Sequence, residues 1–415
     1  MLSFPGSRHW AAVLVLGLVL ALTLAAAACG DEEAQKDEIK DIERGPDTPI
    51  VVPADQPIII GVSVPLTGPD ETAGTEDLHA AVVGVERWKE ENGTAIGGHE
   101  IEIRAEDDGC SESQVTEQAA ERLLGIEGLV GVIGPDCSAG AAAVIPTYAE
   151  AGVVMISGSA TRTDLTLDQP EPRFFFRTAY TNAAEGVLQA RYVVAELDVT
   201  TAYVIDDGEA YGEDLADAAQ EALEATGHTV TRESIVRGTV DFSQLVGRIA
   251  ADNPGVVIFE GFNPAAALLN RQLEDAGYSG PFVSSDAAAS VSDFIEPLGE
   301  LAEGAVFAGC LRDLPEEFLA DYIDIIGSEP TTPFPAQYAD AATILLDAVA
   351  EVAQEQPDGS LVIDPLELRD AVSTPKLLAG LSGTIAFDEN GDRLAESTGL
   401  VMCEVQDGEF VRIRF

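Results

Sequence analysis

Residues 128–160 read GLVGVIGPDCSAGAAAVIPTYAEAGVVMISGSA, and this stretch sets the expectation for the whole fold. The run LVGVI is short and apolar, which is typical of a buried parallel strand. Gly134 and Pro135 end that strand, and Ser138 is placed to cap the helix that follows. A second apolar run, VVMIS, comes after the helix. The order predicts a parallel sheet, with unpaired helix amides at its edge that attract a carboxylate or a phosphate.

The same alternation of short apolar runs and amphipathic stretches continues along most of the chain. It forms two consecutive series of strand–helix units, and the second series ends near residue 311. Two long helical stretches follow, at about 315–327 and 335–355. The C-terminal part is predicted to be hairpin-like, with Asn390 and Gly391 as the turn. Two successive series predict an α/β protein with two mostly parallel sheets, each flanked by helices.

The N-terminal residues 1–28 form a separate segment. They carry Arg8 and then an uncharged apolar run that ends in small residues just before Cys29. This arrangement is typical of a lipoprotein signal peptide, with Cys29 as the lipidated N-terminus, and a single short membrane span is the alternative. Both interpretations place the rest of the chain outside the cytoplasm. Residues 29–56 are polar, acidic and unpatterned, which predicts a flexible tether.

Charge and length exclude some classes of protein. The 415 residues include 73 acidic and 22 basic side chains, so the formal net charge is −51. Such a chain lacks the cationic surface that nucleic-acid binding needs. A solvated acidic surface explains most of these carboxylates and identifies no ligand. The length exceeds one ordinary core and favours two lobes.

The cysteines agree with an exported protein. Apart from Cys29, the chain has an even number of them, namely Cys110, Cys137, Cys310 and Cys403. An even number suits two disulfides in an oxidising compartment. A zinc site is the alternative, but the spacing contains no CxxC pair and no nearby pair of histidines.

The sequence contains no recognisable catalytic motif. No HExxH, GxSxG or GxxxxGK[ST] pattern occurs, and DENGD at 388–392 lacks the spacing of a calcium loop. The histidines after the signal peptide, His79, His99 and His228, are expected at the surface. We therefore expect no enzyme activity, no cofactor and no metal.

Several segments, taken in order, resemble the extracytoplasmic solute-binding proteins of ABC importers of the branched-chain amino-acid type. They are GVSVPLTGPDETAG, DDGCSESQ, IGPDCSAG, VVMISGSATRTDLT, FFFRTAYTNAAEG, DDGEAYGEDLADAAQEAL, VDFSQLVGRI and FDENGD. The resemblance covers about residues 57–415 and implies the two-lobed type I periplasmic-binding-protein fold. Three crossings are then expected near 178–182, 310–314 and 385–392. Lobe 1 would comprise 57–178 plus 312–386, and lobe 2 would comprise 179–311 plus 387–415.

The resemblance also implies a ligand site on lobe 1. A disulfide between Cys110 and Cys137 would fix the loop before the helix, although it could serve only to stabilise the lobe. Hydroxyls and amides at four positions would hold the α-carboxylate of a ligand. These positions are Ser138, Ser159, Ala160 and Thr161. The alternative is that the Ser and Thr residues only cap helices and turns.

On lobe 2, the resemblance places Asp286 against the ammonium group of the ligand, where the family usually has Glu; the alternative is a helix N-cap. Tyr211 would close over the ligand, and Phe262 and Phe334 would form its apolar wall, unless all three only pack in the core. Ala73 falls near a position that is often aromatic in the family, which puts the pocket size in doubt. A second disulfide, Cys310–Cys403, is expected within lobe 2, with two free buried thiols as the alternative.

The resemblance implies a function as well. A monomeric, lipid-anchored protein on the outer face of the cell membrane would capture a small amino acid by closure of its lobes. It would then deliver the ligand to a membrane permease driven by a separate ATPase. The alternative is a sensor that reports amides or other small molecules to a signalling partner.

Overall fold

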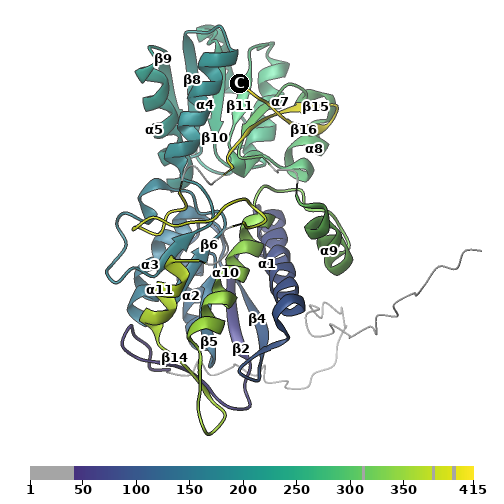
Figure 1. Cartoon of the computed structure of the whole chain (residues 1–415). Helices are drawn as coiled ribbons and strands as arrows, with labels where there is room; N and C mark the ends of the chain where they lie inside the picture. The colour runs from purple at the N-terminus through teal and green to yellow at the C-terminus, as the bar shows by residue number, and fades with distance from the viewer. Residues whose placement is uncertain (1–41, 311–313, 376–378, 395–398) are drawn as a thin grey trace, which may run out of the picture. The chain divides into compact units, whose positions relative to one another are not determined.

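The computed structural model describes residues 42–310, 314–375, 379–394 and 399–415. The expected signal peptide, Cys29 and the first part of the expected tether lie outside these residues. Two large sheets, each flanked by helices, organise the described part of the chain (Figure 1). We call the sheet that contains the first strand–helix series lobe 1 and the other sheet lobe 2, each with its helices.

The sheet of lobe 1 has the strand order β3-β4-β2-β5-β6-β7, and every neighbouring pair except β3–β4 is parallel. Its strands are β2 (Ile58–Val64), β3 (Ala95–Ile96), β4 (His99–Asp107), β5 (Leu129–Ile133), β6 (Val154–Ser157) and β7 (Phe175–Arg177). Its helices are α1 (Glu71–Asn92), α2 (Ser113–Leu124), α3 (Ser138–Ala151), α9 (Glu316–Ile326), α10 (Pro335–Val352) and α11 (Pro365–Ser373). A 3-10 turn, η1 (Thr163–Leu165), follows β6.

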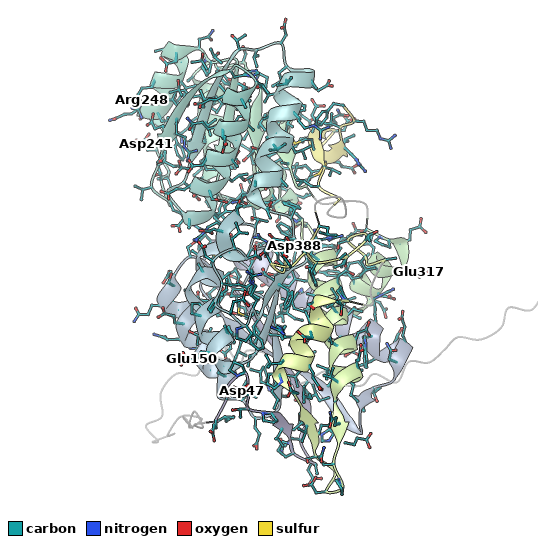
Figure 2. The ribbon with its side chains drawn as sticks, turned by 60° about the vertical axis from the view of Figure 1, so that its left-hand side comes forward. Asp47, Glu150, Asp241, Arg248, Glu317 and Asp388 are labelled. Carbon is teal, nitrogen blue, oxygen red and sulfur yellow. A yellow bond between two sulfur atoms is a disulfide. The ribbon has the colours of Figure 1, made fainter. Side chains whose placement is uncertain are left out.

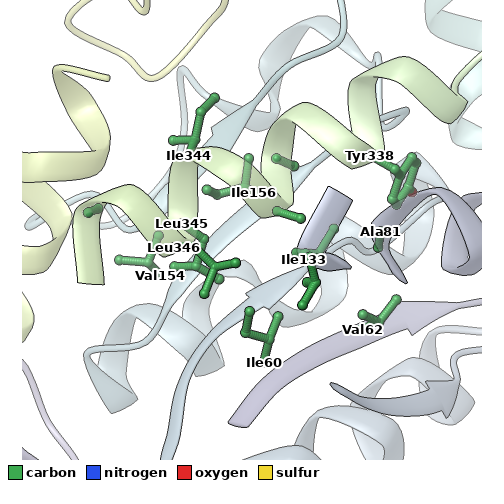
Figure 3. Packing of buried hydrophobic residues seen from close by; sticks show 14 of the residues in the cluster. Ile60, Val62, Ala81, Ile133, Val154, Ile156, Tyr338, Ile344, Leu345 and Leu346 are labelled. Carbon is green, nitrogen blue, oxygen red and sulfur yellow. The ribbon is translucent and has the colours of Figure 1, made fainter. Parts of the chain in front are cut away.

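Alternation along β2 explains how this sheet is covered on both faces. Ile60 and Val62 pack with α1 and α10, as Figure 3 shows together with Leu345 of α10. Ile59 points the other way and joins the cluster formed with α2 and α3. Side chains of a strand alternate between faces, so an almost wholly apolar strand is buried on both sides.

The sheet of lobe 2 has the order β16-β15-β12-β11-β10-β8-β9, parallel from β12 to β9 and antiparallel in the other two pairs. Its strands are β8 (Thr201–Asp206), β9 (Thr229–Ser234), β10 (Val256–Glu260), β11 (Phe282–Ser284), β12 (Val306–Ala308), β15 (Met402–Gln406) and β16 (Glu409–Arg412). Its helical segments are α4 (Asn182–Glu196), α5 (Ala210–Ala225), α6 (Ser243–Asp252), α7 (Ala265–Asp275), η2 (Asp286–Ala288), η3 (Val291–Ile295), α8 (Glu296–Leu298) and η4 (Gly299–Ala302).

The folded part begins earlier than the expected tether boundary at residue 56. Strand β1 (Ile50–Val52) pairs with β14 (Leu361–Ile363), which also pairs with β13 (Gln354–Glu355). Arg44 donates hydrogen bonds to three backbone carbonyls around the start of β5. The run IVV is short and has polar residues on both sides, so the sequence did not indicate a strand there. Two of its three side chains are nevertheless buried.

The third crossing also differs from the prediction. Residues 387–392, expected in lobe 2, lie on lobe 1, where Asp392 pairs with Arg177 at 2.6 Å and Phe387 packs against Phe176. The chain reaches the second sheet only at Val401, whose carbonyl accepts from the amide of Gly309. The described residues from Phe387 to Leu394 therefore belong to lobe 1, and those from Val401 onward belong to lobe 2.

The C-terminal hairpin is formed by β15 and β16, and its turn is at Asp407 and Gly408, both with positive φ. Asn390 and Gly391 instead form a separate turn closed by the bridge between Phe387 and Arg393. Both turns satisfy the same local rule, since Asn, Asp and Gly tolerate positive φ. Only the pairing of distant strands decides which turn belongs to the sheet hairpin.

Histidine burial corrects another expectation. His99 is buried, and its two ring nitrogens contact the carbonyls of Gln56 and Gly359. His79 and His228 are half-exposed. Many acidic side chains are exposed, including Asp47, Glu150 and Glu317, which Figure 2 labels. Within the described ranges, no helix is both long and apolar enough to cross a membrane.

Both expected disulfides are present. Cys110–Cys137 links the segment after β4 to the residue before α3, within lobe 1. Cys310–Cys403 links the segment just after β12 to β15, within lobe 2.

Candidate ligand-binding pocket

A pocket with about 730 Å³ of empty space, counting the open solvent at its mouth, is lined by residues of both lobes. Lobe 1 contributes the start of α1, the loops after β5 and β6, and the segment before α10. Lobe 2 contributes the start of α5 and the loops after β10 and β11. The carboxyl ends of parallel strands, where α/β proteins hold their ligands, therefore supply most of the lining.

Ser138 lines the pocket as the first residue of α3. Contrary to prediction, it is not the N-cap; Cys137 occupies that position and makes no side-chain cap. The Ser138 hydroxyl oxygen accepts from the backbone N–H of Arg162 at 3.1 Å. Its own hydrogen is then free to be donated into the pocket. The first amides of α3 add a positive dipole end beside it.

Of the other residues expected to hold a carboxylate, one lines the pocket and two do not. Ser159 lines the pocket, but its Oγ contacts the Asp136 carboxylate and lies 2.8 Å from the Tyr338 hydroxyl. Ala160 and Thr161 are fully buried and lie outside the lining. The Ala160 amide already donates to Ser157, whereas Thr161 Oγ1 has no hydrogen-bond partner among the described residues.

Asp286 lines the pocket on lobe 2 as the first residue of η2, shortly after β11 ends. It is buried, and its two carboxylate oxygens accept hydrogen bonds from the hydroxyls of Tyr180 and Tyr211. Burial raises the pKa of Asp286, and the two tyrosine hydrogen bonds oppose that rise. No side-chain capping bond is present at η2, so the capping interpretation is wrong.

Aromatic rings line the pocket beside Asp286. The rings of Tyr211 and Phe262 are 5.1 Å apart, and those of Tyr180 and Phe334 are 6.0 Å apart. Tyr211, Phe262 and Phe334 all line the pocket. Tyr180 was missed because a tyrosine after a strand carries no signal of its own; only the fold brings it to Asp286.

Glu76 of α1 holds the segment that presents Phe334. Its carboxylate accepts from the backbone N–H groups and from the hydroxyls of Thr331 and Thr332, at 2.6 to 2.9 Å. These residues are more than 250 positions apart in sequence, so no local pattern could reveal the contact. Charge-assisted bonds of this kind give the loop a defined position.

Carboxylates form an unexpected part of the lining. Besides Asp286, four more aspartates line the pocket, namely Asp70, Asp77, Asp136 and Asp293. Burial raises the pKa of Asp77 well above its usual range, with the charge of Asp136 adding to the rise. Burial likewise raises the pKa of Asp136 to about 6. The pocket is therefore acidic on the lobe 1 side as well as on the lobe 2 side.

Polar contacts join the two lobes near this pocket. Arg237 of lobe 2 donates to both carboxylate oxygens of Asp70 at 2.6 Å and to Ser111 at 2.7 Å, and its guanidinium lies 4.0 Å from the ring centre of Phe262. Thr163 donates through its amide and hydroxyl to Asp214 of α5. These bonds exist only while the lobes are in contact.

Residues 57–409 match the profile of the periplasmic binding protein family, and the chain belongs to that family. It is 29% identical to the Leu/Ile/Val-binding protein BraC3 of Rhizobium johnstonii, over 84% of this chain and 92% of that protein. The type I fold expected from the resemblance is confirmed.

Solved structures of other proteins are similar to this chain along most of its length. The leucine binding protein LivK of Thermotoga maritima has a TM-score of 0.74 and 25% identity, over 86% of this chain and 98% of that one. LivJ of Streptococcus pneumoniae, a branched-chain amino acid transporter substrate-binding protein solved with isoleucine, has a TM-score of 0.74, 22% identity, and coverage of 86% and 100%. Because LivJ is only 22% identical to this chain, its similarity concerns the fold alone.

Proposed function

We propose that this protein is the extracytoplasmic binding subunit of an ABC importer and that it captures an α-amino acid in the pocket between its lobes. The observation that carries the proposal is that one cavity has hydrogen-bond donors on its lobe 1 side and a carboxylate on its lobe 2 side. Ser138 and the α3 N-terminus lie on lobe 1, and the Asp286 carboxylate lies on lobe 2. The names of the relatives support an amino acid as the ligand.

In this proposal the ligand carboxylate accepts hydrogen bonds from Ser138 Oγ and the first amides of α3. The ligand ammonium donates to Asp286, whose charged form the hydroxyls of Tyr180 and Tyr211 stabilise. A ligand that touches both lobes favours their contact, because only that form interacts with both of its ends.

The expected membrane anchor belongs to the same proposal. Cys29 carries a lipid that holds the protein at the outer face of the cell membrane, residues 29–41 serve as the tether, and the protein acts as a monomer that docks on a permease. The ATPase is a separate subunit, since the sequence contains no phosphate-binding loop. The protein itself catalyses no reaction.

The test is isothermal titration of a fragment that starts after Cys29 with amino acids and with their keto-acid analogues. We expect α-amino acids to bind, keto acids not to bind, and Asp286→Asn to lower amino-acid affinity by about 100-fold. Asp241→Asn, at an exposed position, is the matched control. Binding of amides alone would contradict the amino-acid assignment and favour the sensor function instead.

A further inference from the structure

Asp77 is a pocket-lining carboxylate that the function described so far does not use. It lies on α1, one helical turn after Ala73, so both residues share the face that lines the cavity. Ala73 contributes only a methyl group to this part of the lining. Asp77 is 1% exposed, and its Oδ1 has no hydrogen-bond partner among the described residues.

Asp136 lies near Asp77 and lines the same pocket. It is 9% exposed, and its carboxylate is contacted by the Ser159 hydroxyl. Burial raises the pKa of Asp136, and the negative charges of Asp70 and Asp286 raise it further. The two side chains therefore form an acidic pair on lobe 1, which we call the Asp77–Asp136 pair.

The pocket lining offers this pair no cationic partner within the described part of the chain. Among the described residues that line the pocket there is no Lys, Arg or His. Arg237, which is close by, is already engaged by both oxygens of Asp70. A buried carboxyl without a partner stays protonated, in keeping with the raised pKa of Asp77, and a cation placed against it stabilises the charged form. The missing partner is supplied if a ligand brings it.

We propose that the Asp77–Asp136 pair binds a second positively charged nitrogen of the ligand, so that the ligand is an α-amino acid whose side chain ends in an ammonium or guanidinium group. This inference rests on the proposed function, in which Ser138 and Asp286 hold the α-carboxylate and α-ammonium groups. An aliphatic side chain would leave Asp77 buried and unpaired. A cationic side chain satisfies the Asp77 oxygen and offsets the negative charge of the cavity.

The first experiment compares ligands that differ only at the end of the side chain. Lysine is paired with norleucine, ornithine with norvaline, and arginine with citrulline, each titrated calorimetrically against the fragment that starts after Cys29. We expect at least one cationic member to bind about 100-fold more tightly than its neutral partner. Norleucine or leucine binding as tightly as lysine would overturn the inference and leave the proposed amino-acid function in place.

The second experiment uses Asp77→Asn, which keeps the shape and removes the charge. We expect the affinity for the preferred cationic amino acid to fall by about 30-fold and the affinity for its neutral partner to change little. The ratio between the two affinities should therefore become smaller or reverse. A general loss of folding would weaken both ligands alike. The thermal midpoint of the unliganded variant, expected unchanged or higher, separates the two cases, and Asp241→Asn is the exposed control.

The failures can be told apart. If neutral amino acids bind best and Asp77→Asn leaves all affinities unchanged, the inference alone is wrong. If no α-amino acid binds, the proposed function is wrong and the inference falls with it. A diamine such as putrescine, included as a ligand without a carboxylate, should bind weakly; tight binding of the diamine without binding of any amino acid also overturns both.

Discussion

Gly309 shows how one residue without a side chain supports the pocket. It has φ of +67°, and a Cβ atom there would collide with the Tyr180 hydroxyl and lie 2.7 Å from the Cβ of Asp286. Tyr180 donates to Asp286 at 2.9 Å. The tyrosine can approach the carboxylate only because position 309 carries no Cβ atom.

We therefore expect Gly309→Ala to weaken ligand binding by about tenfold and to lower the free energy of unfolding by about 1–3 kcal/mol. Titration calorimetry and denaturant unfolding measure the two effects. Gly304→Ala is the matched control, because Gly304 also has positive φ but its Cβ would meet open space. Equal losses of affinity in both variants would show that backbone strain, and not the collision with Tyr180, is the cause.

At the scale of elements, α1 connects the core of lobe 1 to the pocket. Its middle packs closely on α10, where a Cβ on Gly84 would lie 2.6 Å from the carbonyl oxygen of Ala339. Its first turns carry Ala73 and Asp77 to the cavity. Glu76, on the same turns, holds the loop that leads into α10. The helix therefore positions pocket residues from two distant segments.

Glu76→Gln tests this connection. The change removes the negative charge of residue 76, so the hydrogen bonds from the amides and hydroxyls of Thr331 and Thr332 are no longer charge-assisted. We expect a loss of about 1–3 kcal/mol in the free energy of unfolding, measured by denaturant titration, and a weaker affinity for the ligand. Glu90→Gln, at an exposed position of α1, should change neither quantity. An unchanged stability of the Glu76 variant would contradict the role of this loop contact.

For the whole molecule, buried carboxyls determine how stability depends on pH. Burial raises the pKa of Asp108 to about 7, of Asp136 and Asp207 to about 6, and of Glu260 to about 8. A group whose pKa is raised by folding binds more protons in the folded state than in the unfolded state. Its stabilising effect is present below the unfolded pKa and is lost as pH rises through the folded pKa.

The free energy of unfolding should accordingly fall as pH rises from about 5 to about 8. Unfolding in about 1 M salt is the appropriate measurement, because salt screens repulsion between exposed carboxylates but not the cost of burial. Glu260→Gln should reduce the fall by on the order of 1–3 kcal/mol, whereas Asp241→Asn should not. Equal stability at both pH values would contradict this account.

The elements follow from local patterns that can be read without a structure. The apolar runs, such as residues 129–133, become buried parallel strands, and the amphipathic stretches become the covering helices. Periodicity is a local property of the chain, and it reports which face of an element is buried. Pocket residues that close a strand or begin a helix, such as Ser138, Asp286 and Tyr211, were predicted with help from the family resemblance.

The class of fold and the order of strands and helices follow from the residues of the chain alone, whereas the two cysteine pairs were expected from the family resemblance. Tertiary structure alone decided the third crossing, the inclusion of Ile50–Val52 in a sheet, and the acidic wall formed by Asp77 and Asp136. The physical reason is distance along the chain. Whether a carboxylate is solvated, paired or buried without a partner depends on groups contributed by remote segments, and only the folded chain brings those groups together.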